Sequence, residues 1–156
     1  SQKNNQILHI KFMVVEKEII EIKKMKILKV TGAIIRNKNN FLICRRGPNE
    51  KAAGYWEFPG GKVEKNEKLK DCMARELREE LNIDAVVGDL YEHYFFDSGK
   101  ITYDLYFFII KKFNGTITKT VHDQIKWLKL EDFKNYNFLP GDGPLIKKLI
   151  DDDGNN

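Results

Sequence analysis

The chain has 156 residues and a mass of 18.3 kDa, which suits one domain with a sizeable core and leaves little room for a second. Ten Phe and six Tyr exclude a disordered chain, and the net charge of +4, spread over mixed signs, excludes a nucleic-acid-binding tail. Two cysteines, Cys44 and Cys72, are too few for a disulfide framework, and no apolar run reaches the length of a membrane span. We therefore expect a reduced, cytoplasmic protein without membrane or nucleic-acid partners.

The first 24 residues show no clear pattern. Ile10, Phe12 and Val14 alternate with other residues as in a short strand. Met25 suits the start of a compact domain, so the segment before it is interpreted as an extension, an extra edge strand or an artefact of the expressed sequence. We divide the chain into an N-terminal extension of unknown role over 1–24, a domain over 25–150 and a disordered tail over 151–156.

From residue 26 onward, strand-like runs alternate with helical ones. Residues 27–35 are nearly all apolar, which predicts a strand buried on both faces. The clearest helix is predicted over 67–81, where every fourth residue from Leu69 is large and apolar, and Asn82 can adopt the left-handed conformation that ends a helix. Other predicted elements are strands over 41–44, 85–96, 101–113 and 125–128, a short turn or helix from 131, and a closing helix over 143–150. This mixture indicates an α/β sandwich around a mixed sheet.

Three carboxylates share one stripe of the predicted helix. Glu76, Glu79 and Glu80 stand at positions i, i+3 and i+4. Packed carboxylates need a neutralising cation, and hard divalent ions such as Mg²⁺ take oxygen ligands that they share with phosphate. Upstream, the segment 58–62 contains a glycine turn that lets the backbone approach a ligand or metal. Taken alone, the stripe is explained more simply as a solvated helix face.

The spacing of these residues resembles the Nudix box of the Nudix hydrolases. Gly61, Glu67 and the run 75–83 meet every fixed position of this 23-residue pattern except one, where Asn82 replaces the usual Gly. Asn tolerates the same backbone conformation, so we expect a small effect on activity.

The resemblance extends over about residues 26–150. Residues 30–35, Arg45-Arg46 and 56–64 look like the MutT-like branch of the family, which sanitises nucleotide pools, and especially like the CTP and modified dCTP or dGTP pyrophosphohydrolases. The resemblance implies a single-domain α/β/α sandwich around a mixed β-sheet. It also implies attack by water on a nucleoside triphosphate, giving the monophosphate and pyrophosphate. A highly charged phosphate chain needs bridging cations, which agrees with the carboxylate cluster.

The resemblance implies roles for individual residues of the box. Glu79 or Glu80 would orient or deprotonate the attacking water, Arg75 would align the glutamates, and Glu67 would lie near the water path. The implied ligands of Mg²⁺ (or Mn²⁺) are the carbonyl of Gly60 and the side chains of Glu76, Glu79 and Glu80.

Family members often carry another acidic ligand shortly before the strand that contains Trp127. Here that position is Val121, with His122 and Asp123 beside it. We therefore expect no fourth carboxylate ligand. Asp123 would replace it only if the loop shifts, and a surface turn residue is the simpler interpretation.

Four residues are candidates for binding the nucleotide. By resemblance, Arg46 faces the nucleotide, although Arg45 and Arg46 also suit exposed charges at a strand end. Phe58 or Phe95 would stack on a base, although a core position is the default for each. Asp142 maps to a base-reading position, where it would accept a hydrogen bond from an exocyclic amine. It equally suits the N-cap of the last helix.

We interpret the chain as a divalent-metal-dependent pyrophosphohydrolase of CTP or of an oxidised or methylated dNTP. One alternative is a Nudix hydrolase of dinucleoside polyphosphates or nucleotide sugars. The other is a non-catalytic nucleotide-sensing domain, which the intact carboxylates of Glu76, Glu79 and Glu80 disfavour. The sequence does not determine the base or the choice between Mg²⁺ and Mn²⁺. It also does not determine whether the protein is a monomer or a homodimer.

Overall fold

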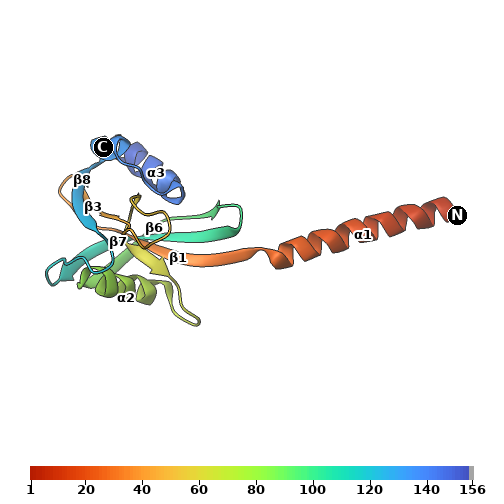
Figure 1. Ribbon diagram of the computed structural model, residues 1–156, viewed down its shortest axis with the longest axis horizontal. Coiled ribbons are helices and arrows are strands. Elements are labelled where there is room, and N and C mark those ends of the chain that lie inside the picture. The colour runs from red at the N-terminus through yellow and green to blue at the C-terminus, as the bar shows by residue number, and fades with distance from the viewer. Residues whose placement is uncertain (155–156) are drawn as a thin grey trace.

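The computed structural model describes residues 1–154, apart from the side chain of Lys23. Figure 1 shows a domain of sheets and helices from which one long helix projects. In chain order the elements are α1 (Gln2–Lys24), β1 (Lys26–Ile34), β2 (Arg36–Asn37), β3 (Asn40–Arg45), β4 (Trp56–Glu57), β5 (Gly60–Lys62), α2 (Leu69–Leu81), β6 (Asp84–Asp97), β7 (Ile101–Asn114), β8 (Gln124–Lys129), the 3₁₀ turns η1 (Leu130–Asn135) and η2 (Pro140–Asp142), and α3 (Gly143–Gly154).

Within residues 1–154 the strands form two four-stranded sheets. The first has the order β5-β1-β7-β6 and is mixed, because β1 runs parallel to β7 while the β1–β5 and β6–β7 pairs are antiparallel. In the second, β3 pairs antiparallel with β2, β4 and β8. The mixed sheet predicted from the sequence is confirmed.

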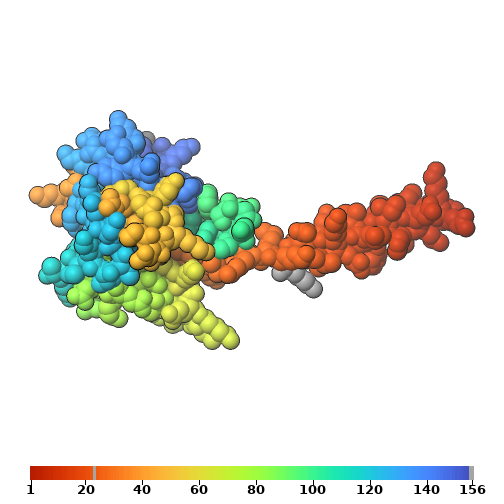
Figure 2. All heavy atoms as spheres, viewed as in Figure 1, coloured from red at the N-terminus to blue at the C-terminus, as the bar shows by residue number. Residues whose placement is uncertain are grey.

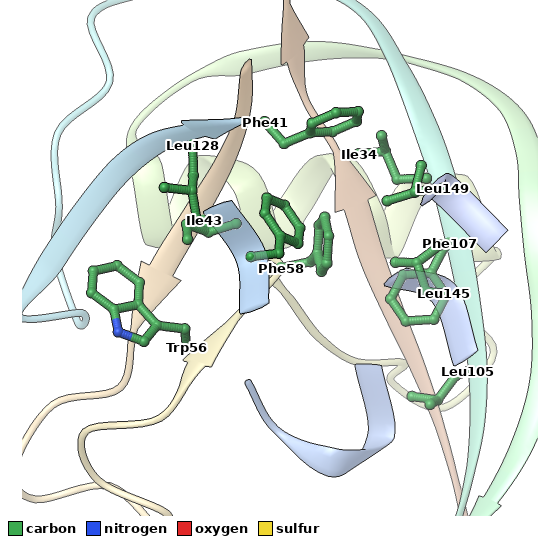
Figure 3. Close-up of a cluster of buried hydrophobic side chains, with 11 residues drawn as sticks. Ile34, Phe41, Ile43, Trp56, Phe58, Leu105, Phe107, Leu128, Leu145 and Leu149 are labelled. Carbon is green, nitrogen blue, oxygen red and sulfur yellow. The ribbon is translucent and has the colours of Figure 1, made fainter. Parts of the chain in front are cut away.

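Neighbouring residues of the central strands pack into different cores, because successive side chains of a strand point to opposite faces. Ile34 joins a cluster with Leu145 and Leu149 of α3 (Figure 3), whereas Ala33 and Ile35 join a second cluster with residues of α2. The two helices lie on opposite sides of the sheets in Figure 1. This arrangement is the predicted α/β/α sandwich.

The helix α2 and its end agree with the sequence pattern. Asn82 has φ 57° and ψ 40°, the left-handed conformation that was expected of it. The helix begins at Leu69, so Glu67 precedes it instead of lying on it. The first strand was predicted to be buried on both faces, and this holds only for its second half. Near its start, Ile27 is 55% exposed.

Two predictions for the chain ends are wrong. Residues 2–24 form the single helix α1, not a short strand. The alternation of Ile10, Phe12 and Val14 is misleading because the intervening Met13 is apolar too, and nothing before residue 25 breaks a helix. A disordered tail was predicted over 151–156, but Asp151 to Gly154 continue α3. The rest of that predicted tail, 155–156, lies outside the described residues.

Figure 2 shows α1 extending away from the rest of the chain. Its role as an extension stays a prediction. Neither α1 nor any other helix of the described chain has the apolar length needed to cross a bilayer.

Candidate active site

The glycine turn lies directly against the carboxylates of α2. The backbone N–H of Gly60 donates a hydrogen bond to Oε2 of Glu80 at 3.1 Å. A Cβ atom on Gly61 would lie 2.3 Å from the carboxyl carbon of Glu76, and one on Gly60 would lie 1.9 Å from the carbonyl oxygen of Thr31. Position 60 therefore requires glycine, because a side chain there would collide with the backbone of β1, whereas a side chain at position 61 would displace the carboxylate of Glu76.

Arg75 holds three glutamates at once. Its Nε and Nη2 donate to the two carboxylate oxygens of Glu67 at 2.7 and 3.0 Å, and its Nη1 donates to Glu76 at 2.9 Å and to Glu79 at 3.2 Å. The hydrogen bonds from Arg75 lower the pKa of Glu67 to about 2, so this carboxylate is ionised at neutral pH. The forked guanidinium aligns the carboxylates in the way the sequence predicted for Arg75.

The side chain of Glu80 lies in surroundings that disfavour a negative charge. Burial, followed by the nearby charges of Glu57 and Glu76, raises its pKa to about 9. Burial also raises the pKa of Glu76. A bound cation would remove this penalty for both side chains.

A divalent cation fits these residues as an open site. In the part of the chain that the structure describes, no group of three or more acidic, His or Cys side chains is placed so that it could hold a metal ion by itself. Glu79, one of the ligands implied by the resemblance, instead accepts a hydrogen bond from Arg75, and its side chain is 58% exposed. Mg²⁺ usually keeps several waters and binds through one or two carboxylates plus substrate phosphates. Glu76, Glu80 and the carbonyl of Gly60 suit that mode of binding.

A cavity of about 740 Å³ connects the turn with the rest of the site. Its lining includes Arg46, Glu57, Phe58, Gly60, Glu80 and Asp142. These residues come from β3, the β4–β5 segment, α2 and η2, so the fold brings together residues that are far apart in the sequence. The predicted nucleotide residues Arg46, Phe58 and Asp142 thus share one cavity with Glu80.

Asp142 lies at the wall of this cavity and is itself buried. Its Oδ2 accepts a hydrogen bond of 3.2 Å from the backbone N–H of Phe58. This bond joins it to the β4–β5 segment instead of to the first turn of α3, which disfavours the N-cap interpretation. Burial, followed by the charge of Glu57, raises the pKa of Asp142 to about 8, so the carboxyl is mostly protonated at neutral pH.

The sequence interpretation missed a buried ion-pair cluster around Glu57. Nη1 of Arg46 donates to both of its carboxylate oxygens, at 2.9 and 3.2 Å, and Nε2 of His122 lies 3.1 Å from Oε1. The other ring nitrogen of His122, Nδ1, is buried without a partner in the described chain. A Glu between two aromatic residues of a largely apolar segment was the available signal for Glu57.

Two residues considered from the sequence lie elsewhere. Phe95 is 61% exposed and does not line the cavity, whereas the next residue, Phe96, does. The two differ because neighbouring side chains of a strand point to opposite faces. Asp123 accepts two hydrogen bonds from Arg45, at 2.7 and 3.0 Å, and is not part of the cavity wall.

Comparison with known proteins assigns the chain to a family. The NUDIX domain family matches residues 26–149. CTP pyrophosphohydrolase of Escherichia coli K12 is 37% identical over 127 residues, which cover 81% of this chain and 93% of that protein. 8-oxo-dGTP diphosphatase of the same organism is 34% identical over 128 residues, covering 80% and 98%. The crystal structure of the MutT protein from Methanosarcina mazei Go1 superposes with a TM-score of 0.74 at 28% identity, covering 85% and 99%.

The sandwich fold and these matches identify a Nudix hydrolase. The chain belongs to the Nudix family. The family match begins at residue 26 and therefore excludes α1.

Proposed function

We propose that this chain hydrolyses a nucleoside triphosphate with a cytosine base, ordinary or modified, to the monophosphate and pyrophosphate. The observation that supports this proposal most directly is that one backbone segment donates hydrogen bonds to two carboxyl groups. Within one short segment, the N–H of Phe58 binds Asp142 and the N–H of Gly60 binds Glu80. A nucleotide whose base contacts Asp142 therefore extends its phosphates toward Glu80 in the same cavity.

Four cationic side chains of the protein line the cavity. Arg46, Lys26, Lys51 and Lys62 all contribute to the cavity wall. Arg46 is held by Glu57, so its guanidinium is fixed before a substrate arrives. These side chains attract the triphosphate and offset its charge.

Nudix hydrolases generally depend on divalent metal ions, and for this chain we propose Mg²⁺, with Mn²⁺ as a substitute. Glu76, Glu80 and the carbonyl of Gly60 would hold it. When bound, the ion supplies charge neutralisation at the phosphates and lowers the pKa of a bound water. Glu79 keeps a largely exposed carboxylate at this edge, where it orients the attacking water, and Arg75 fixes its direction.

The protonated carboxyl of Asp142 favours cytosine. A neutral carboxyl group has one O–H donor and one carbonyl acceptor side by side. Cytosine presents the complementary pair, because N3 accepts a hydrogen bond and the N4 amine donates one. Guanine presents two donors on its pairing edge, N1–H and N2–H, and these suit an ionised carboxylate. With Asp142 in its neutral form, the site therefore suits cytosine.

The test is product analysis across a panel of CTP, dCTP, 5-methyl-dCTP, 8-oxo-dGTP, a dinucleoside tetraphosphate and a nucleotide sugar, each with Mg²⁺ and with a chelator. We expect metal-dependent release of pyrophosphate, with the highest kcat/KM for the cytosine nucleotides. A higher kcat/KM for 8-oxo-dGTP at pH 7 would contradict the assignment of the base. Cleavage of only the dinucleotide or the sugar would identify another Nudix substrate, and binding without cleavage would indicate a sensing domain.

The two cysteines are free thiols, which fits our proposal that the protein works in the reducing cytoplasm. Cys44 and Cys72 are both buried. Burial raises the pKa of each thiol, so neither is a reactive nucleophile. The hydrolytic chemistry is therefore assigned to the carboxylates alone.

A further inference from the structure

Helix α1 carries a large apolar surface that the domain does not cover. Its apolar side chains from Ile7 to Ile22 are each between 45% and 67% exposed. The helix projects away from the sheets in both overall views (Figures 1 and 2). A helix with this much exposed apolar surface is not stable alone in water and requires a partner surface.

Five of these residues form one continuous line along the helix. Leu8, Phe12, Val15, Ile19 and Ile22 follow one another at spacings of 4, 3, 4 and 3 residues. This is the heptad pattern by which helices pair in coiled coils, with apolar residues at the two inward positions. We call these five residues the α1 seam. Other lines along the helix are interrupted, as Glu16 interrupts the line through Met13 and Ile20.

The charges that flank the α1 seam suit a second copy of the same helix. Lys11 and Glu18 lie on one flank, and His9 and Glu16 lie on the other. In an antiparallel pair Lys11 faces Glu18 of the other copy, and in a parallel pair it faces Glu16. Either direction places opposite charges together across the seam.

A lipid surface fits these charges less well. Helices that lie on anionic membranes concentrate Lys and Arg on the polar face. Here the acidic Glu16, Glu18 and Glu21 are interspersed with the lysines of α1. The mixed signs favour a protein helix of matching charge over an anionic lipid surface.

We propose that α1 pairs with α1 of a second copy through the α1 seam and makes the protein a homodimer. The pairing covers the apolar side chains that the monomer leaves exposed. It involves none of the residues assigned to hydrolysis, so it stands or falls independently of the proposed function.

The test compares two double variants of the full chain by sedimentation equilibrium over a wide range of concentration. V15E/I19E places charges in the α1 seam. The matched control V14E/I20E places the same charges on the adjacent residues outside the seam, where Val14 and Val15 are equally exposed at 51%. Thermal unfolding of the domain verifies that both variants are folded.

We expect the wild type and V14E/I20E to have about twice the mass of 18.3 kDa, and V15E/I19E to have the monomer mass. A wild type that is monomeric at every concentration would overturn the proposal. So would equal loss of association in both variants, because general apolarity and not the seam would then drive it. Binding of a monomeric wild type to phosphatidylserine vesicles would replace the proposal with a membrane-surface role.

Discussion

Gly60 and Glu80 are joined by a hydrogen bond of 3.1 Å from the backbone N–H of the glycine to the carboxylate of the glutamate. The bond connects the β4–β5 turn to helix α2 across the cavity wall. Two residues earlier, the N–H of Phe58 binds Asp142 in the same way. The position of this backbone segment therefore determines both the hydrolytic end and the base end of the site.

Substitution of Gly60 by Ala should destabilise the fold. The added Cβ would lie 1.9 Å from a backbone oxygen of β1, which cannot move without disturbing the sheet. We expect a loss of about 1–3 kcal/mol in the free energy of unfolding, measured by urea denaturation. Gly143→Ala is the control, because a Cβ there meets open space. Equal stability of the two variants would show that the turn is looser than described.

Arg75→Lys should reduce turnover while leaving substrate affinity nearly unchanged. Lysine cannot reproduce the fork that binds Glu67, Glu76 and Glu79 together. We expect kcat to fall about ten- to hundredfold, as for other residues that orient ligands, with KM little affected. Arg78→Lys on the same helix is the control, since Arg78 pairs only with the exposed Asp84 in the described chain. A raised KM with an unchanged kcat would instead assign Arg75 to substrate binding.

The preference for cytosine should depend on pH through Asp142. Its carboxyl has a raised pKa of about 8, so the neutral form dominates below this value and the carboxylate above it. The ratio of kcat/KM for CTP to that for 8-oxo-dGTP should fall as the pH rises from 7 to about 9. In Asp142→Asn the side-chain amide retains a donor and an acceptor at every pH, and the ratio should stay constant. A wild-type ratio that does not change with pH would remove Asp142 from base recognition.

Glu57→Gln should move this pH dependence. The charge of Glu57 contributes to the raised pKa of Asp142, and it is held in place by Arg46 and His122. Its removal lowers the pKa of Asp142, so the change in base preference should occur at lower pH. Glu50→Gln is the control, because Glu50 is a second, more exposed carboxylate partner of Arg46. If both variants shift the profile equally, the effect passes through Arg46 and not through the charge next to Asp142.

Local patterns in the sequence predicted helix α2 and its left-handed end correctly. The spacing of Glu76, Glu79 and Glu80 and the left-handed Asn82 are properties of one helix and its end, so they can be derived without knowing the tertiary fold. The pairing of Arg75 with Glu67 follows from the same short stretch of chain.

Contacts between distant segments could not be derived in this way. His122 lies 65 residues from its partner Glu57, and Asp142 lies 84 residues from Phe58. The conformation of α1 was also mispredicted, because apolar residues outside the α1 seam, such as Ile10, Met13 and Val14, obscure its heptad spacing.

The release of pyrophosphate from CTP by Glu80→Gln tests the central claim most directly. Glutamine keeps the size of Glu80 and can still accept the hydrogen bond from Gly60, but it lacks the charge that holds a divalent ion. With Mg²⁺ present, we expect wild-type turnover in the control Asp71→Asn, an exposed acid on the same helix, and a loss of at least about a hundredfold in Glu80→Gln with unchanged thermal unfolding. Turnover of Glu80→Gln at the wild-type rate would contradict the assignment of this cavity as the hydrolytic site.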